Sequence, residues 1–260
     1  MATPASLATR RILLTRPADR GQGLASIISR AGGIAEHIPA LEIVSCELSE
    51  QDLAVMRSPT DFAAAFFISV NAVAFAARHT TLAAFSAIPV IAPGRATAAR
   101  LRSAGAGEAI LPEGRHDSEG MLQIPVLQTI RDNHVLIVRG HGGRDTLRAK
   151  LSERGARVRI VEVYERRLPA RCAADLSSAL NRGLDAVCVA SGETLDNLLN
   201  AAGEQVPRLT RLPVFVPSQR VAALAAEAGF EHITVTRSPD DEGYAESLLA
   251  WADRINRHSE

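Results

Sequence analysis

A long internal repeat constrains the fold of this 260-residue chain more than any other feature of its sequence. The segment VLIVRGHGGRDTLRAKLSERGARVRIVEVYERR, which begins at Val135, aligns without a gap on ILLTRPADRGQGLASIISRAGGIAEHIPALEI, which begins at Ile12. Farther along, AAAFFISVNAV is echoed by DAVCVASGETL, and IPVIAPGRATAARLRSAGA by LPVFVPSQRVAALAAEAGF. The period from Ile12 to Val135 far exceeds the roughly 20 to 50 residues of a solenoid unit. The repeat therefore predicts two copies of one α/β half.

Apolar runs alternate with helical patterns in both copies. The runs at 12–15 and 135–138 are continuous, which is typical of parallel strands covered on both faces. After the first run, Leu24, Ile27 and Ile28 recur at helical spacing. This alternation predicts an α/β fold with parallel sheets wrapped by helices. Further strands are expected at 63–68, 89–92, 157–164, 185–189, 213–216 and 232–236, and helices at 49–57, from 71, at 97–103, 145–154 and 219–228, and in AESLLAWADRI.

The apolar run from Ile34 to Val44 is unusually long and contains Pro39. Because proline cannot donate to a β-ladder, the far half of this run is predicted to be an exposed connector and not a central strand.

Two arrangements of domains are compatible with the repeat. In the simpler one, two contiguous halves meet near residue 130. In the other, residues 1–42 and 168–260 form one domain that holds both termini, and residues 43–167 form the second. The long extended runs AEHIPALEIVSCE and VRIVEVYERRLPA favour the interleaved arrangement, because they could cross side by side as a two-stranded β hinge.

The charge balance and the cysteines exclude several classes of protein. Positive and negative side chains number 29 each, so no bulk field is available to hold nucleic acid or an anionic membrane. Cys46, Cys172 and Cys188 show no C-x-x-C spacing and predict neither a disulfide framework nor a zinc site. The uncharged run from Phe62 to Ala77 is shorter than the roughly 20 residues that span a bilayer. We expect a cytoplasmic protein without nucleic-acid or membrane partners.

Small, hydroxyl and basic residues follow most of the predicted strands. Ligands of parallel α/β sheets bind outside the carboxyl ends of the strands, where helix N-terminal amides receive anions. Any one such residue is more often a helix cap than a ligand. Their recurrence predicts a site for a ligand with several carboxylates or phosphates. The segments concerned are Arg16-Pro17, Ser69-Val70-Asn71, Pro93-Gly94-Arg95, the stretch from Arg139 to Gly143, Ser191-Gly192 and Pro217-Ser218.

Other motifs give little support to a cofactor. In GHGG the third glycine of a dinucleotide loop is replaced by Asp145, so a nicotinamide or flavin site is not predicted. The seven histidines lack metal-ligand spacing. Cys188 lies inside an apolar run, where a cysteine more often packs than reacts. We expect no cofactor and no metal.

The chain has two tyrosines, and the sequence pattern predicts different roles for them. Tyr164 ends the second run of the later copy, where the first copy has Leu41. A phenol in place of the repeat's apolar residue hints at function, although half-buried strand tyrosines are common. Tyr244 is predicted to cap or pack.

The order and spacing of a set of motifs resemble the uroporphyrinogen-III synthase family from about Arg11 to the end of the chain. The set is LLTRP, FISVNAV, PGRATAARL, SEGML, LIVRGHGGRDTLRAKLSERGARVRIVEVYER, VASGETLDNLL and VPSQRVAALAAEAGF. The resemblance implies two interleaved domains joined by a two-stranded ribbon. It also implies a cofactor-free lyase of tetrapyrrole biosynthesis, which closes linear hydroxymethylbilane to uroporphyrinogen III with inversion of the last pyrrole ring. A monomer is expected, and a transient contact with the preceding pathway enzyme is left open.

The resemblance also implies roles for individual residues. The family's catalytic tyrosine falls on Tyr164, and its GxxTA turn on Gly94 and Thr97. The second GxxTA departs here to SQRVA, which moves the hydroxyl role to Ser218 and lets Arg220 supply charge. Together with the strand-end residues, the predicted substrate-binding set is Arg16, Ser69, Asn71, Gly94, Thr97, Arg139, Gly140, Gly142, Ser191, Gly192, Ser218 and Arg220. Arg144 is a further candidate for the eight carboxylates of hydroxymethylbilane.

The residues alone also allow functions of other classes. A hinge-closing binding protein could sense an anionic metabolite without chemistry, although the chain lacks a DNA-reading or membrane segment to transmit a signal. A sugar-nucleotide transferase with two facing α/β domains would be larger than 260 residues.

Overall fold

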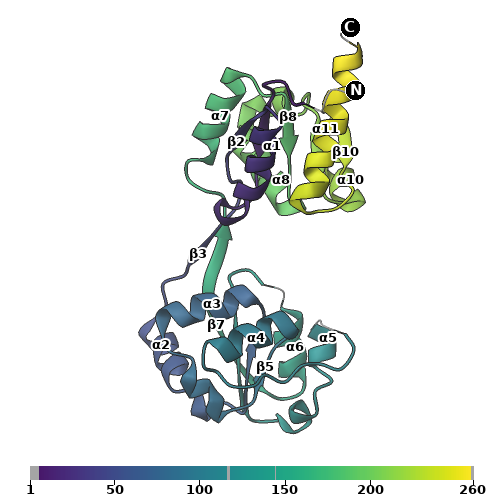
Figure 1. Cartoon of the computed structure of the whole chain (residues 1–260). Helices are drawn as coiled ribbons and strands as arrows, with labels where there is room; N and C mark the ends of the chain where they lie inside the picture. The colour runs from purple at the N-terminus through teal and green to yellow at the C-terminus, as the bar shows by residue number, and fades with distance from the viewer. Residues whose placement is uncertain (1–5, 116–117, 144, 259–260) are drawn as a thin grey trace. The chain divides into compact units, whose positions relative to one another are not determined.

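The computed structural model describes residues 6–115, 118–143 and 145–258, and it divides into two compact units. Unit 1 comprises Met1–Glu42 and Arg167–Glu260, and unit 2 comprises Ile43–Arg166. The chain passes between the units twice, within strand β3 (Glu42–Ser45) and within strand β7 (Arg157–Arg167). These two strands are neighbours in one sheet (Figure 1).

Unit 1 is built on a five-stranded sheet in the order β10-β9-β8-β1-β2, with parallel pairing throughout. Helices α1 and α11 cover one face through side chains such as Leu24 and Leu248, and α7, α8 and α10 cover the other. Alternate strand residues serve the two faces, so Leu13 packs on one side and Leu14 on the other. The strands are β1 (Arg11–Leu14), β2 (Ile34–His37), β8 (Ala186–Cys188), β9 (Val214–Val216) and β10 (Ile233–Val235), and the helices are α1 (Gln22–Arg30), α7 (Cys172–Arg182), α8 (Gly192–Ala202), α9 (Val206–Leu209), α10 (Gln219–Glu227) and α11 (Asp241–His258).

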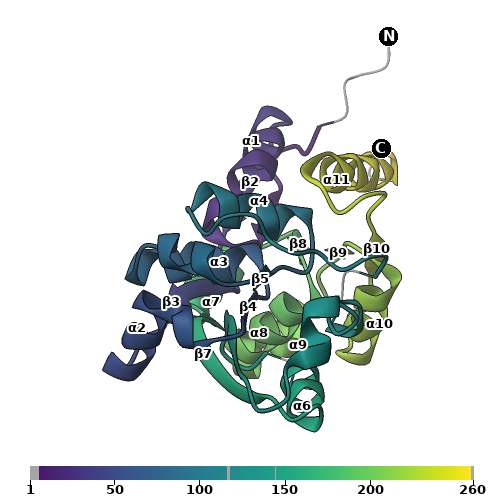
Figure 2. The same ribbon diagram turned by 90° about the horizontal axis from the view of Figure 1, so that it is seen from below.

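Unit 2 has a five-stranded sheet in the order β3-β7-β6-β4-β5. The pairs β7-β6, β6-β4 and β4-β5 are parallel. Helices α2, α3 and α4 pack on one face with Phe67, and α5 and α6 pack on the other with Phe66. Figure 2 shows α3 beside α4. The remaining elements are β4 (Ala64–Phe67), β5 (Val90–Ile91), β6 (His134–Gly140), α2 (Glu50–Arg57), α3 (Val70–His79), α4 (Arg95–Ser103), α5 (Ser118–Met121) and α6 (Thr146–Glu153).

The two sheets share one strand order over four strands, as expected for two copies of one α/β half. The sequence repeat relates β1, β2, β8 and β9 to β6, β7, β4 and β5, and these strands hold corresponding places in the two sheets. Beyond β5, Ile110 forms a parallel bridge with Ile91, in the place that β10 has beside β9. Strand β3 of unit 2 has no counterpart in the sheet of unit 1. The α/β fold class, with two mostly parallel sheets wrapped by helices, is confirmed.

The prediction for the stretch after Pro39 is right that it is not a central strand, but wrong that it is an exposed connector: it contains the edge strand β3, and Ala40 and Leu41 are buried. The run from Ile34 breaks into β2 and β3, which belong to different sheets. At the break, the amides of Ile38 and Ala40 still bond to the carbonyls of Leu14 and Thr15. Because Pro39 lies between the two strands, its missing N–H interrupts neither ladder, and β3 can form an edge strand beside β7.

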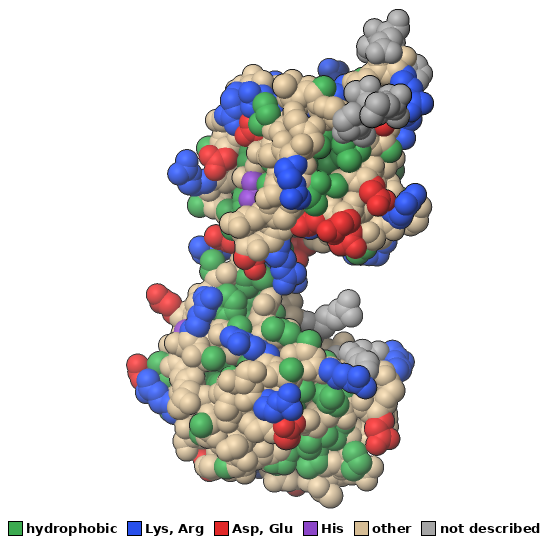
Figure 3. Space-filling view, viewed as in Figure 1, with side chains coloured by type: hydrophobic (Ala, Val, Ile, Leu, Met, Phe, Trp, Pro, Cys, Tyr) green, Lys and Arg blue, Asp and Glu red, His purple; other side chains and the backbone are tan. Residues whose placement is uncertain are grey.

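Charges of both signs are interspersed on the face of each unit that Figure 3 shows. None of the helices among the described residues combines the length and the apolarity needed to cross a bilayer.

Candidate active site

Tyr164 lies near the carboxyl end of β7 and contacts the ends of neighbouring elements in unit 2. Its Oη is 3.3 Å from Oγ of Ser69, the residue that follows β4 and Ile68. The Tyr164 ring also packs on Phe75 of α3, with ring centroids 5.5 Å apart. Because β6 separates β7 from β4, the tyrosine reaches across the end of β6 to meet Ser69.

The turn that follows β6 contacts Tyr164. Gly140 is the register partner of Tyr164, and the amide of His141 donates to the Tyr164 carbonyl at 2.7 Å. A Cβ atom on Gly140 would lie 2.5 Å from Cε2 and Cζ of the Tyr164 ring. Gly142 has a left-handed backbone with φ of 68°. The turn is thus shaped by glycines, two of which the sequence predicted as ligands.

Arg139 is held by acidic groups of unit 2. Its guanidinium donates to Glu162 Oε1 at 3.1 and 3.2 Å, and to Asp145 Oδ1 at 3.1 Å. It also donates to the carbonyl of Gly143 at 3.0 Å, and its side chain is only 12% exposed. Hydrogen bonds from Arg148 and Arg139 lower the pKa of Asp145. Arg139 therefore stabilises the turn, and a substrate carboxylate would have to compete with Glu162 for it.

Three serines at strand ends are helix N-caps. Ser69, Ser191 and Ser218 accept hydrogen bonds from the third amides of α3, α8 and α10, at 3.1, 3.2 and 3.4 Å. Ser191 also forms a capping box with Thr194. Each hydroxyl retains its own proton for donation, and the first two amides of each helix are not used by the cap.

Two further predicted residues begin α4. Gly94 is its N-cap with an extended backbone, and Thr97 lies in its first turn with 5% of its surface exposed. Asn71 is half-buried in the first turn of the neighbouring α3. These N-termini follow the adjacent strands β4 and β5, which places them at the same sheet edge as Tyr164.

At the corresponding edge of unit 1, the Arg16 side chain binds residues at the start of α11. It forms an ion pair with Asp241 and donates to the carbonyl of Pro239 at 2.8 Å. Its guanidinium carbon lies 4.9 Å from the ring centroid of Tyr244. Tyr244 is buried and donates to the carbonyl of Val189 at 2.6 Å, and burial raises the pKa of this phenol. Tyr244 therefore packs and bonds as the sequence predicted.

Arg220 extends from the first turn of α10 toward the start of α8. Its Nη1 is 3.6 Å from the point where Gly192 would carry a Cβ atom, and that point is only 2.9 Å from Leu224 Cδ1. Gly192 therefore permits the close packing of α8 on α10. Arg220 is exposed and has no ion-pair partner within the described ranges. It is a cation that an anionic ligand at this edge could reach.

Comparison with known proteins identifies the family. A family model described as uroporphyrinogen-III synthase HemD matches residues 22–246. The chain is 32% identical over 250 residues to the uroporphyrinogen-III synthase of Salmonella typhimurium strain LT2, in an alignment that covers 91% of this chain and 99% of the relative.

The chain belongs to the uroporphyrinogen-III synthase family. The enzyme of that name from Escherichia coli K12 is 32% identical over 252 residues, with the same coverage of 91% and 99%. The resemblance inferred from the motifs is therefore confirmed.

Solved structures of this family have the same fold. A mutant uroporphyrinogen III synthase of Thermus thermophilus aligns with a TM-score of 0.58 at 17% identity, over 95% of this chain and 99% of that one. Uroporphyrinogen-III synthetase of Helicobacter pylori 26695 gives 0.57 at 18% identity, over 93% and 99%. At these identities the comparison concerns the fold alone.

Within each unit, the structure brings together part of the predicted set. Tyr164, Ser69 and Gly140 are in contact in unit 2, and Gly192 and Arg220 are close in unit 1. Arg16 and Arg139 point into internal ion pairs instead, and Arg144 lies outside the described residues. The ligand roles of the whole set stay predictions.

Two residues at this edge were missed. Phe75 lies four residues after Asn71, and that helical spacing from a predicted ligand was an available signal. Glu162 is the register partner of Arg139, but its opposite charge indicates pairing only once the strand register is known.

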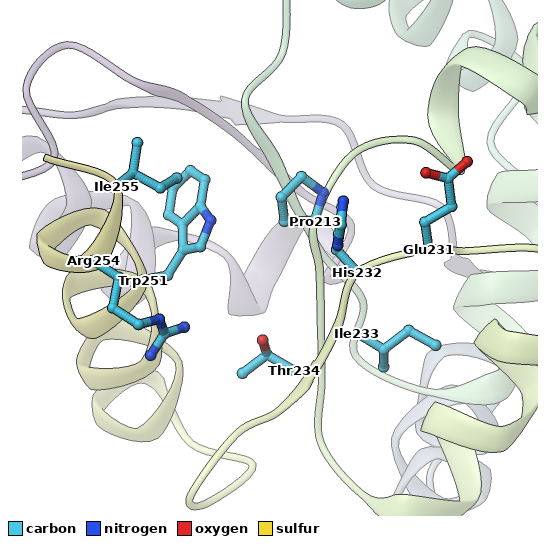
Figure 4. A pocket seen from close by; sticks show the side chains of 8 residues that line it. All are labelled: Pro213, Glu231, His232, Ile233, Thr234, Trp251, Arg254 and Ile255. Carbon is cyan, nitrogen blue, oxygen red and sulfur yellow. The ribbon is translucent and has the colours of Figure 1, made fainter. Parts of the chain in front are cut away.

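Two cavities formed by residues within 6–115, 118–143 and 145–258 are lined by side chains other than Tyr164. One of about 530 Å³ lies at the amino ends of β9 and β10, against Trp251 and Ile255 of α11 (Figure 4). This is the opposite sheet edge from Ser191 and Ser218. A second, of about 450 Å³ in unit 2, is lined by Cys46, Glu162 and their neighbours.

The described residues offer no metal centre. Among them, no group of three or more histidine, cysteine, aspartate or glutamate side chains is arranged to hold an ion. Cys188 is buried, and burial raises the pKa of its thiol. It packs in the core between the sheet and α11, as the sequence predicted.

Proposed function

We infer that the chain catalyses the reaction of its family, the closure of linear hydroxymethylbilane to uroporphyrinogen III with inversion of the terminal pyrrole ring and loss of water. It is then a cyclising lyase of tetrapyrrole biosynthesis. The match over 91% of the chain to proteins named for this activity carries the inference. The position of Tyr164 at the carboxyl edge of its sheet supports it.

The proposed mechanism begins when the terminal hydroxyl takes up a proton and its C–O bond breaks, so that water departs and an azafulvene cation is left. The last ring then attacks through its substituted carbon to form a spiro intermediate, which fragments and recloses, and the reclosed ring releases a proton to give the neutral product. In this scheme the O–H of Tyr164 donates a hydrogen bond to the departing hydroxyl. Ser69, 3.3 Å away, orients that donor. Folding the four rings into the spiro geometry is a positioning task, which supplies more of the acceleration than one acid contact.

Substrate binding is proposed to rest on helix N-termini. The eight carboxylates of hydroxymethylbilane need several anion sites, and the starts of α3, α4, α8 and α10 offer free amides. Arg220 adds a charge at the start of α10. The hinge role of β3 and β7, the cytoplasmic location, the monomeric state and any contact with the preceding pathway enzyme stay predictions.

The proposed function is tested by incubating the protein with hydroxymethylbilane and separating the products by chromatography. Inversion of the terminal ring gives the type III isomer, whereas closure without inversion gives type I. We expect type III to dominate, and a reaction without protein to serve as the control. Tight binding of hydroxymethylbilane without any type III product would favour the metabolite-binding alternative.

Removal of metal ions is expected to leave the reaction intact. The sequence lacks metal-ligand spacings and a complete dinucleotide motif, and the proposed steps need only hydrogen bonds and charge. Dialysis against a chelator followed by the isomer assay measures this. Loss of activity that one specific ion restores would contradict the cofactor-free prediction.

Arg220→Gln is expected to raise the KM for hydroxymethylbilane with little change in kcat. Removing an exposed charge from a bound carboxylate costs about 1 kcal/mol, or roughly fivefold in affinity. A contact that stabilises the bound substrate and the transition state equally affects KM and not kcat. Arg30→Gln is the matched control, because Arg30 is exposed in the last turn of α1, at the other sheet edge. An equal change in both variants would mean that the effect is one of overall charge.

A further inference from the structure

Gly140 was predicted as a substrate-binding residue, but its surroundings assign it a different task. We propose that Gly140 is a positioning residue for Tyr164: the absence of its side chain sets where the tyrosine hydroxyl lies. The inference rests on the proposed function, since it assumes that Tyr164 acts on the substrate.

The contact between Gly140 and Tyr164 is produced by an irregularity in the β6-β7 pairing. Arg139 pairs with Glu162, but the next residue, Gly140, pairs with Tyr164 and not with Val163. One extra residue on β7 therefore turns the tyrosine toward the end of β6. Bulges of this kind re-aim a side chain and are frequent beside active sites.

The Tyr164 ring occupies the space that a side chain at position 140 would need. A Cβ atom there would lie 2.5 Å from Cε2 and Cζ and 2.9 Å from Oη of Tyr164. Carbon atoms in ordinary contact are about 3.5 to 4.0 Å apart, so a methyl group would displace the ring by roughly 1 Å. The reactive oxygen is at the displaced edge.

Other contacts make the hydroxyl position specific. Ser69 Oγ lies 3.3 Å from the tyrosine Oη, and the N-cap bond to the amide of Ala72 holds Ser69 in place. Phe75, itself buried, packs on the ring. A ring displaced by a methyl group on Gly140 would leave Ser69 or press on Phe75. Misplacement by about 1 Å can reduce a rate on the order of 100-fold.

Backbone conformation does not explain the glycine at position 140. The φ of Gly140 is outside the left-handed region, so alanine could adopt its conformation. Gly142 in the same turn is the reverse case: its φ is 68°, and nothing lies within 4 Å of its missing Cβ atom. The two glycines thus make a matched pair, one required by the tyrosine ring and the other by the backbone.

A double-mutant cycle tests the proposal. Type III product formation is measured for the wild type, Gly140→Ala, Tyr164→Phe and the double variant. We expect Gly140→Ala to lower kcat about 10- to 100-fold when Tyr164 is present and less than about threefold in the Tyr164→Phe background. Gly142→Ala should act by the same factor in both backgrounds. Equal losses from Gly140→Ala in both backgrounds would overturn the proposal, because a merely structural role does not depend on the hydroxyl.

A stability measurement covers the case in which Gly140→Ala folds poorly. Gly140→Ala should lower the urea midpoint of the wild type, but it should lower the midpoint of Tyr164→Ala, which lacks the ring, much less. If Gly140→Ala alone fails to fold, the double variant should fold. Absence of this rescue would overturn the packing argument. If the wild type forms no type III product, the catalytic half of the proposal falls with the proposed function. The rescue would then show that the fault lies in the function and not in the packing.

Discussion

Replacing Tyr164 with phenylalanine is expected to lower the rate of type III product formation by roughly 10- to 1,000-fold, which reaches up to the cost of removing one hydrogen-bond donor from a transition state. The substitution keeps the ring that packs on Phe75 and removes only the hydroxyl. Activity should persist at a reduced level, since the helix N-termini still position the substrate. The rate is measured with the isomer assay, and stability by urea unfolding, which should change little.

The second tyrosine provides the matched control. Tyr244→Phe removes a buried hydroxyl that donates to the Val189 carbonyl at 2.6 Å. It should lower the free energy of unfolding by about 1 to 3 kcal/mol, because a buried acceptor loses its partner, and it should leave the rate unchanged. If Tyr164→Phe retained full rate while Ser191→Ala or Thr97→Val abolished it, the acid role would belong to another residue.

Cutting the gene near residue 130 is expected to give two fragments that do not fold alone. In unit 1, β1 lies between β2 and β8, and in unit 2, β4 lies between β5 and β6. The cut separates β1 from β8 and β4 from β6, so each fragment would expose the edges of two incomplete sheets. Circular dichroism during urea titration should show no cooperative transition in either fragment.

The control is a different cut of the same chain. Residues 43–166 contain β4 to β7 and their helices, and this fragment should unfold cooperatively because its sheet stays whole apart from the first residue of β3 and the last residue of β7. Cooperative unfolding of a fragment that ends near residue 130 would instead favour the contiguous division.

The fold class could be predicted because its signals are local. The apolar runs at 12–15 and 135–138 became β1 and β6, and the pattern around Leu24 became α1. The repeat added long-range information, since it related strands that proved to hold corresponding places. The run from Ile34 misled because periodicity does not say which sheet a strand joins, and its two halves joined different sheets.

The candidate site could be predicted only as a set of positions. Arg16 and Arg139 follow strands as expected, but their acidic partners are set by tertiary contacts: Asp241 lies 225 residues from Arg16 in the chain. The N-cap roles of Ser69, Ser191 and Ser218 followed from residue type. The contact of Gly140 with the Tyr164 ring depends on a shift in strand register, which no local pattern encodes.

The double passage of the chain between the units also sets an order of events during synthesis. Unit 2 is complete once residue 166 has left the ribosome, but β1 must wait for β8, because Ile12 pairs with Ala186. At about 5 to 20 residues per second, synthesis from Ile12 to Ala186 takes roughly 10 to 35 s. Throughout this time the first strand of unit 1 has no β8 to pair with, and once Arg166 has emerged the inserted unit can fold before β8 does. The carboxyl-terminal part of unit 1 therefore assembles onto a segment that was translated first. Nascent chains arrested before β8 should contain a folded unit 2 and a protease-sensitive amino-terminal segment.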